Sequence, residues 1–190
     1  MGMLMRKINW DELAVPGLTG GKKTALTIGV FDGLHRGHRL LIEKIIAKAP
    51  DLLPAVVTFR KNPKPLNSLQ KDIVSFEEKM ALLAGFGTAL CVIIDFSEQF
   101  SKISGRVFLE TLNRYLCPAY IALGANFHCG YRRDTDAEGF SAIAKTLGIE
   151  TEIAPPVLEG GLPISSSRIR AALEAGRIEE AALFLGRPIT

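Results

Sequence analysis

Two histidines separated by a glycine form the segment of this sequence best suited to chemistry. His35, Gly37 and His38 stand in the order His-x-Gly-His, and Asp32 and Gly33 come just before them. Glycine has no Cβ, so it lets a ligand approach the backbone closely, and imidazoles on either side can donate hydrogen bonds to one anion. The segment therefore predicts a site for phosphate oxygens. The alternative is that both histidines only cap a helix or face solvent.

The elements on either side of the histidines support the phosphate prediction. Residues 24–31 are apolar or β-favouring, which predicts a buried strand of a parallel sheet. After His38, apolar residues recur at helical spacing, which predicts a helix that begins there. A strand, a glycine loop and a helix aim free N–H groups and the positive end of a helix dipole at one point. Such a point attracts phosphate.

A second candidate anion site lies near the end of the chain. Ser165, Ser166 and Ser167 come before Arg168, at the start of a predicted helix. Serines cap the first N–H groups of a helix and can also bind phosphate, whereas an arginine in the first turn opposes the helix dipole. An anion at that end would explain the arginine, because a guanidinium binds phosphate well. The alternative is a plain serine cap beside a solvent-facing arginine. Two such helix starts in one chain favour a nucleoside triphosphate.

The rest of the pattern predicts the fold class. Residues 1–21 are predicted to be an irregular lead-in. Short apolar runs alternate with amphipathic segments, which predicts an α/β fold with a parallel sheet of about five strands and helices on both faces. In such sheets ligands bind beyond the carboxyl ends of the strands. After the first strand and helix, the predicted strands cover 54–59, 89–96, 119–123 and 150–154, and the predicted helices cover 75–84, 104–116 and about 140–147. The loops 35–38, 60–65 and 124–130 should therefore gather at one edge of the sheet.

The amino-acid composition is typical of a globular protein. The chain has 190 residues, 47% hydrophobic and 23% charged, with a formal net charge of +3, which fits one globular domain. The charge is too small to indicate nucleic-acid binding. The sequence shows no membrane-length apolar stretch and no signal peptide, and its three cysteines form no CxxC pair. We therefore expect a cytoplasmic protein without structural zinc.

Four segments together resemble a known family. They are residues 30–38 (VFDGLHRGH), 124–130 (GANFHCG), 164–170 (ISSSRIR) and 176–188, which end in Leu-Gly-Arg-Pro. In this order they resemble the FAD synthetase (FMN adenylyltransferase) domain of prokaryotic bifunctional riboflavin kinase/FAD synthetases, within the HxGH nucleotidylyltransferase superfamily. The resemblance covers nearly the whole chain after about Thr24. It implies a Rossmann-like fold and a single domain over residues 1–190. The riboflavin kinase domain that follows in bifunctional members is absent, which fits a monofunctional protein or a chain cut at the domain boundary.

The resemblance also implies a reaction and roles for residues. ATP and FMN would give FAD and pyrophosphate, with Mg²⁺ accompanying ATP and no side chain as a direct metal ligand. The implied catalytic residues are His35, His38 and Arg168. The implied ATP-binding residues are Gly29, Phe31, Asp32, Gly33, His35, Gly37, His38, Ser165, Ser166 and Arg168. The implied FMN-binding residues are Phe59, Asn62, Pro63, Asn126 and Phe127, and a flap over Phe59–Pro65 would close on the flavin.

The chain departs from the family pattern at two places. The family's Phe-x-Pro-His-Pro flap here lacks its first proline and its histidine, and Cys129 replaces a phenylalanine. Both changes lie on the flavin side. Two alternatives therefore stay open. The chain could be another HxGH nucleotidylyltransferase with a different phosphorylated acceptor, such as phosphopantetheine or a cytidylyl acceptor, or a paralogue that binds nucleotide or flavin without turnover. The sequence does not indicate an oligomeric state.

Overall fold

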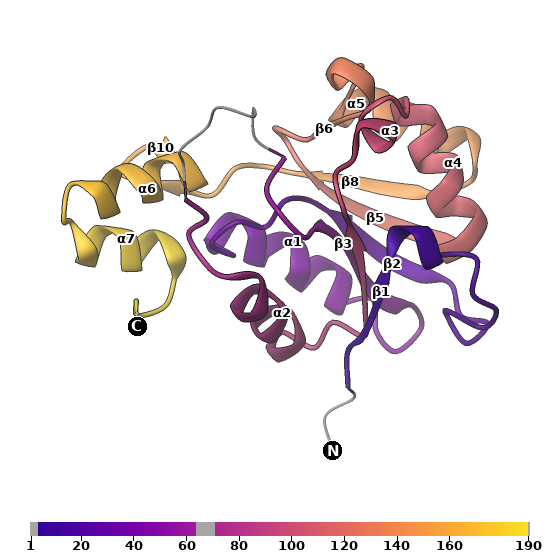
Figure 1. The fold of residues 1–190 in the computed structure, drawn as a ribbon, viewed down its shortest axis with the longest axis horizontal. Helices are drawn as coiled ribbons and strands as arrows, with labels where there is room; N and C mark the ends of the chain where they lie inside the picture. The colour runs from indigo at the N-terminus through magenta and orange to yellow at the C-terminus, as the bar shows by residue number, and fades with distance from the viewer. Residues whose placement is uncertain (1–3, 64–70, 190) are drawn as a thin grey trace.

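A computed structural model describes residues 4–63 and 71–189 of the chain. Its centre is a six-stranded sheet in the order β1-β4-β3-β2-β5-β8, and every neighbouring pair is parallel (Figure 1). The strands are β1 (Arg6–Asn9), β2 (Thr24–Ile28), β3 (Leu53–Phe59), β4 (Leu90–Ile94), β5 (Pro118–Gly124) and β8 (Glu150–Ala154). The strand order reverses at β2, between β3 and β5. This is the topological switch point at which open parallel sheets bind ligands.

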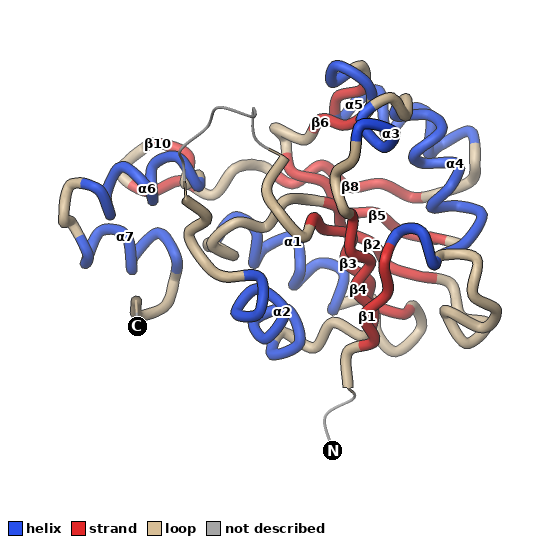
Figure 2. The backbone as a smooth tube through the Cα atoms, in the orientation of Figure 1, coloured by secondary structure: helices blue, strands red, loops and turns tan. Residues whose placement is uncertain are grey.

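Helices cover both faces of the sheet (Figure 2). Because successive strand side chains point to opposite faces, Val56 on β3 packs toward α1 and α2, whereas Val57 packs toward α4 and α5. The helices are α1 (Arg36–Ile46), α2 (Phe76–Gly85), α3 (Glu98–Ser101), α4 (Gly105–Leu116) and α5 (Ala137–Thr146). Both sheet faces are therefore apolar, which explains why the strands are continuous hydrophobic runs.

The last part of the chain forms a smaller unit beside the sheet. Helices α6 (Ser166–Glu174) and α7 (Ile178–Leu185) pack on each other around Ile169, Ala172 and Phe184 (Figure 1). The remaining elements are the short strands β6 (His128–Cys129), β7 (Thr135–Asp136), β9 (Leu158–Glu159) and β10 (Leu162–Pro163), with the 3-10 turns η1 (Trp10–Glu12) and η2 (Tyr131–Arg133). Among the described residues, no helix is long and apolar enough to span a bilayer.

The predicted α/β class is confirmed, and β8 has the predicted bounds. The lead-in prediction was wrong, because residues 6–9 form β1 and make the sheet six-stranded. Only Ile8 of this short segment is buried, and the pairing of the segment with β4 is a tertiary contact that local pattern does not reveal. Helix α1 also begins two residues before His38, because His35 caps it. Residues 64–70, which include the last two residues of the predicted flap, lie outside the described residues.

Candidate active site

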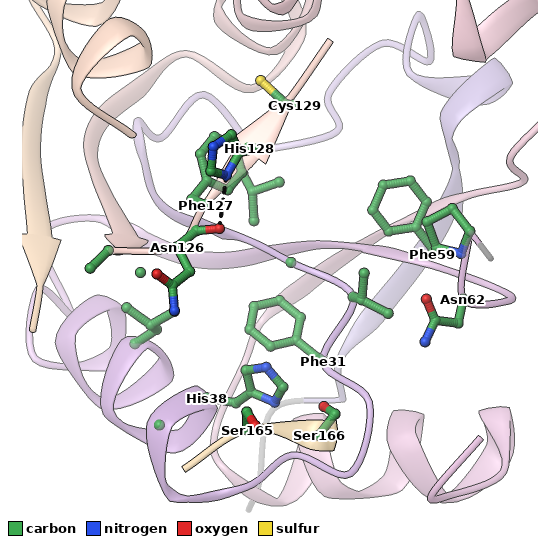
Figure 3. A pocket seen from close by; sticks show the side chains of 18 of the residues that line it. Phe31, His38, Phe59, Asn62, Asn126, Phe127, His128, Cys129, Ser165 and Ser166 are labelled. Atoms are coloured by element: carbon green, nitrogen blue, oxygen red, sulfur yellow. Dashed lines mark hydrogen bonds between the residues drawn. The ribbon is translucent and has the colours of Figure 1, made fainter. Parts of the chain in front are cut away.

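A cavity of about 610 Å³ opens beyond the carboxyl ends of the central strands. Segments that follow β2, β3, β5 and β8 all line it, as the predicted gathering of loops requires. Figure 3 shows His38 beside Ser165 and Ser166, with Phe59 and Asn62 from another loop and Asn126 and Phe127 from a third. The predicted site residues that line the cavity are Gly29, Phe31, His35, Gly37, His38, Phe59, Asn62, Pro63, Asn126, Phe127, Ser165 and Ser166.

The loop between β2 and α1 is held in an uncommon backbone conformation. Phe31 and Leu34 have φ values of 53° and 45°, which are unusual for bulky side chains, and Gly33 has a φ of 79°. Both side chains are almost completely buried, and this packing offsets the backbone strain. The turn thereby places His35 as the N-cap of α1, where its Nδ1 accepts a hydrogen bond of 3.4 Å from the His38 N–H.

The two imidazoles are stacked, with ring centroids 3.6 Å apart. Burial lowers the pKa of His35 to about 4. Burial also lowers the pKa of His38 well below its usual value, and the nearby His35 and Lys79 lower it further. Both rings are therefore neutral at neutral pH. The Nδ1 atom of His38 is buried and has no hydrogen-bond partner among the described residues, so no protein hydrogen bond at this atom fixes the ring.

We expect the neutral histidines to make stability depend on pH. An unfolded His35 takes up a proton below pH 6.5, whereas the folded one does so only near pH 4. Stability should therefore be complete above pH 6.5 and fall as pH drops from 6.5 to 4, because the unfolded state binds more protons. At about 1.4 kcal/mol per pKa unit, His35 alone accounts for a loss on the order of 3 kcal/mol. Urea unfolding at a series of pH values measures this loss, and His35→Gln should reduce the dependence in that window by the His35 share, while the share of His38 remains.

The second helix start meets the histidine loop. Ser165 caps α6 by accepting from the Arg168 N–H at 3.3 Å, and Ser166 donates its hydroxyl proton to the Asp32 carbonyl at 3.0 Å. The Asp32 carboxylate forms a buried ion pair with Arg170. Two motifs 134 residues apart in sequence are thus joined directly. The N-termini of α1 and α6 both border the cavity, which is the arrangement that a polyphosphate requires.

Three predicted site residues do not line the cavity: Asp32, Gly33 and Arg168. The Arg168 guanidinium donates to the carbonyl oxygens of Leu162, at 2.8 Å, and Pro163, at 3.0 Å, and its central carbon lies 4.4 Å from the Phe184 ring. It therefore holds the β9–β10 hairpin against α6 and α7. Asp32 accepts from the Ile73 N–H at 2.8 Å and pairs with Arg170. This geometry gives the predicted phosphate contact of Arg168 no support.

A second part of the lining is mostly apolar. Phe59, Phe100 and Phe127 belong to it with Phe96, Ile103 and Phe108, and the amides of Asn62 and Asn126 add polar groups to the lining. An aromatic wall of this kind suits a flat, conjugated ring. Sequence reasoning missed Phe96 and Phe100, although they follow β4 and the rule that sites form beyond strand ends could have found them.

The loop after β5 adds a cation and a thiol to the lining. Arg133 borders the cavity with a φ of 62°, in the left-handed region. Cys129, at the position where the family has phenylalanine, also lines it, and burial raises the pKa of this thiol to about 12. The thiol therefore stays protonated and uncharged. Its sulfur adds soft, apolar surface to the aromatic wall.

The lining does not resemble a metal site made of protein ligands. Within residues 4–63 and 71–189, no carboxylate lines the cavity and no cluster of three or more histidine, cysteine or acidic side chains could hold an ion. Hydroxyls, amides and neutral imidazoles are present instead. Because Mg²⁺ commonly stays bound to substrate phosphates and water, this lining fits a nucleotide that carries its own cation.

Comparison with known proteins adds a family assignment to this geometry. The family model described as FAD synthetase matches residues 19–168. A bifunctional riboflavin kinase/FMN adenylyltransferase of Escherichia coli K12 is 28% identical over 169 residues, which cover 86% of this chain and 54% of that protein. The chain thus spans about half the length of this relative.

Two solved structures share the fold. A macrolide-efflux protein of Streptococcus pneumoniae superposes with a TM-score of 0.84 at 28% identity, covering 97% of this chain and 63% of that one. Pantoate-beta-alanine ligase of Francisella tularensis superposes with a TM-score of 0.63 at 16% identity, covering 94% and 78% respectively. At the lower identity, the similarity concerns the fold alone.

Proposed function

Because this chain belongs to the FAD synthetase family, we propose that it is an FMN adenylyltransferase, which transfers AMP from ATP to FMN and releases FAD and pyrophosphate. One observation carries the proposal: two helix N-termini that suit phosphate border the same cavity as an aromatic wall that suits a flavin ring. A nucleoside triphosphate and a flavin phosphate would then meet between them. The relative from Escherichia coli, which is named for this activity, supports the same assignment.

For this reaction the protein has to align FMN with ATP and to stabilise the negative charge that develops on the phosphates. An FMN phosphate oxygen attacks the α-phosphorus of ATP, a new P–O bond forms, and the bond to the β-phosphate oxygen breaks, so pyrophosphate leaves. The attacking oxygen is already anionic and needs no general base. In our proposal His35 and His38 donate to the reacting phosphate, and Ser165, Ser166 and the N-terminus of α6 hold the β- and γ-phosphates. Donors placed in advance where charge develops are the main source of rate in such reactions.

A magnesium ion would be held by the nucleotide phosphates, and the hydroxyls of Ser165 and Ser166 are hard oxygen donors in the lining. It would neutralise phosphate charge and so help pyrophosphate to leave. The neutral histidines fit this arrangement, because they can donate hydrogen bonds without repelling a nearby cation.

The direct test is to incubate the purified protein with ATP, Mg²⁺ and FMN and to measure FAD and pyrophosphate. We expect equal amounts of both products, and none when riboflavin replaces FMN, because riboflavin has no phosphate to attack. Turnover only with another phosphorylated acceptor would identify a different nucleotidylyltransferase. Tight binding of FMN or ATP without pyrophosphate release would indicate a binding protein.

Asn126 gives a prediction specific to the acceptor. Its side chain lines the cavity beside Phe127 (Figure 3), and we propose that its amide hydrogen-bonds the flavin. Asn126→Ala should then raise KM for FMN about 10-fold, the effect of losing about 1.4 kcal/mol of hydrogen bonding. Steady-state kinetics should show kcat and KM for ATP changed less than about 2-fold. A matching rise in KM for ATP would place Asn126 on the nucleotide side instead.

A further inference from the structure

A buried lysine contacts two segments that line the cavity without lining it itself. Lys79 is on α2 and only 6% exposed. Its Nζ donates to the carbonyl oxygen of Phe59 at 2.6 Å and to that of Val30 at 3.3 Å. Val30 follows β2 and Phe59 ends β3, so one ammonium group bridges the two loops that carry the histidines and the predicted flavin wall. Burying a lysine ammonium costs free energy unless the group is hydrogen-bonded. The two hydrogen bonds to these carbonyls offset that cost.

The Val30 carbonyl is held from two sides. Besides Lys79, the Thr58 hydroxyl donates to it at 3.1 Å. The peptide unit that contains this carbonyl leads directly into Phe31, whose φ of 53° is strained for an aromatic residue. Two donors on the preceding carbonyl fix the plane of that peptide. They therefore stabilise the turn that buries the Phe31 side chain.

Phe31 in turn supports the reacting histidine. Its ring is fully buried and meets His38 edge-on, with centroids 5.2 Å apart. His38 also stacks on His35. Since the His38 Nδ1 has no hydrogen-bond partner in the described part of the chain, contact with these two rings sets the orientation of the imidazole. A shift of Phe31 would therefore turn His38.

We propose that Lys79 is a positioning residue for adenylyl transfer. Through the Val30 carbonyl and Phe31 it fixes the His38 ring, and through the Phe59 carbonyl it fixes the loop on the acceptor side. The Lys79 ammonium thus fixes the position of the histidine loop relative to the loop on the acceptor side. The consequence for turnover rests on the proposed function, whereas the consequence for the histidine ring does not.

The first test follows the imidazoles by NMR and needs no activity. The chain has only three histidines, so their ring resonances can be assigned by substitution. In Lys79→Met we expect the His38 and His35 ring signals to shift, while those of exposed His128 stay in place. Because the Lys79 charge also acts on His38 directly, the uncharged change Thr58→Val at the same carbonyl should shift the His38 signals as well. Lys145→Met, at an exposed site on α5, should move none of them. Unchanged His38 signals in a folded Lys79→Met protein would overturn the proposal.

The second test separates positioning from simple stabilisation. We expect Lys79→Met to lower kcat at least 10-fold at a temperature where it is fully folded, with KM for ATP changed less than 2-fold. Thr58→Val removes the other donor to the Val30 carbonyl, so the double variant should lose more than the product of the single losses. If the loss of kcat in the double variant only equals the product of the single losses, positioning through this carbonyl is contradicted. A Lys79→Met protein with a lower melting temperature but an unchanged kcat would contradict it as well.

Two controls keep the outcomes distinct. If Lys79→Met does not fold, Thr58→Val tests the same carbonyl with a side chain of equal shape, and its His38 signals decide the question. If the unmodified protein forms no FAD, the proposed function fails, but the NMR comparison still decides whether Lys79 orients His38.

Discussion

His38→Ala should lower kcat for FAD formation by about 10²–10³-fold, the usual cost of removing one donor aimed at developing negative charge. His38 lines the cavity at the N-terminus of α1 and stacks on His35. Its neutral ring can donate one hydrogen bond to the reacting phosphate, and that bond gains most strength in the transition state. KM for ATP should therefore change far less than kcat. Steady-state kinetics with saturating FMN measure both quantities.

Arg39→Ala is the matched control for this prediction. Arg39 is the next residue on α1, but its side chain is exposed and pairs with Glu43 at 2.7 Å. Its loss should leave kcat within about 2-fold of the unsubstituted protein, because exposed ion pairs contribute little. If His38→Ala were as active as Arg39→Ala, the His38 ring would take no part in phosphate binding and the proposed mechanism would be wrong.

Arg170→Met should cause the largest loss of stability that we predict. Arg170 and Asp32 form an ion pair whose side chains are only 12% and 5% exposed. Removing Arg170 leaves the Asp32 carboxylate buried without its ion-pair partner, although the Ile73 N–H still donates to it; breaking a buried pair in this way costs about 3–5 kcal/mol. For a chain of this size the melting temperature should fall on the order of 10 °C. Urea unfolding gives the free energy, and calorimetry gives the melting temperature.

A second substitution shows whether the loss comes from the stranded carboxylate. Asp32→Asn in the Arg170→Met background removes the remaining charge and should recover part of the lost stability. Arg177→Met is the surface control, since its pair with Glu180 is 55% and 39% exposed and should contribute less than about 1 kcal/mol. Equal losses for Arg170→Met and Arg177→Met would show that the buried pair does not hold the two motifs together.

The elements with strong local signals were predictable. The buried strands and amphipathic helices follow from periodicity, and the cap of α4 follows from Ser104, which accepts from the Val107 N–H at 3.3 Å. β1 was not predictable in the same way. Its four residues carry little apolar pattern of their own, and the exposed edge of β4 supplies the pairing.

The arginines show why a motif does not fix the role of each member. Arg168 and Arg170 stand two residues apart in the serine-arginine segment, and sequence reasoning assigned the phosphate role to Arg168. In the fold, Arg168 holds the carbonyls of the β9–β10 hairpin, whereas Arg170 reaches the histidine loop through Asp32. On a helix these two side chains point in different directions, and only the packing of α6 decides which one meets the other motif.

The sequence by itself determined the α/β class, the family resemblance and the two helix starts that bracket the cavity, because glycine turns, serine caps and hydrophobic periods act over a few residues. The tertiary structure alone decided that Arg170 pairs with Asp32, that Lys79 lies under Val30 and Phe59, and that Phe96 and Phe100 extend the aromatic wall. The first of these contacts joins residues 138 positions apart. Such contacts depend on how the sheet and its helices pack, and no local pattern in the sequence encodes the partner.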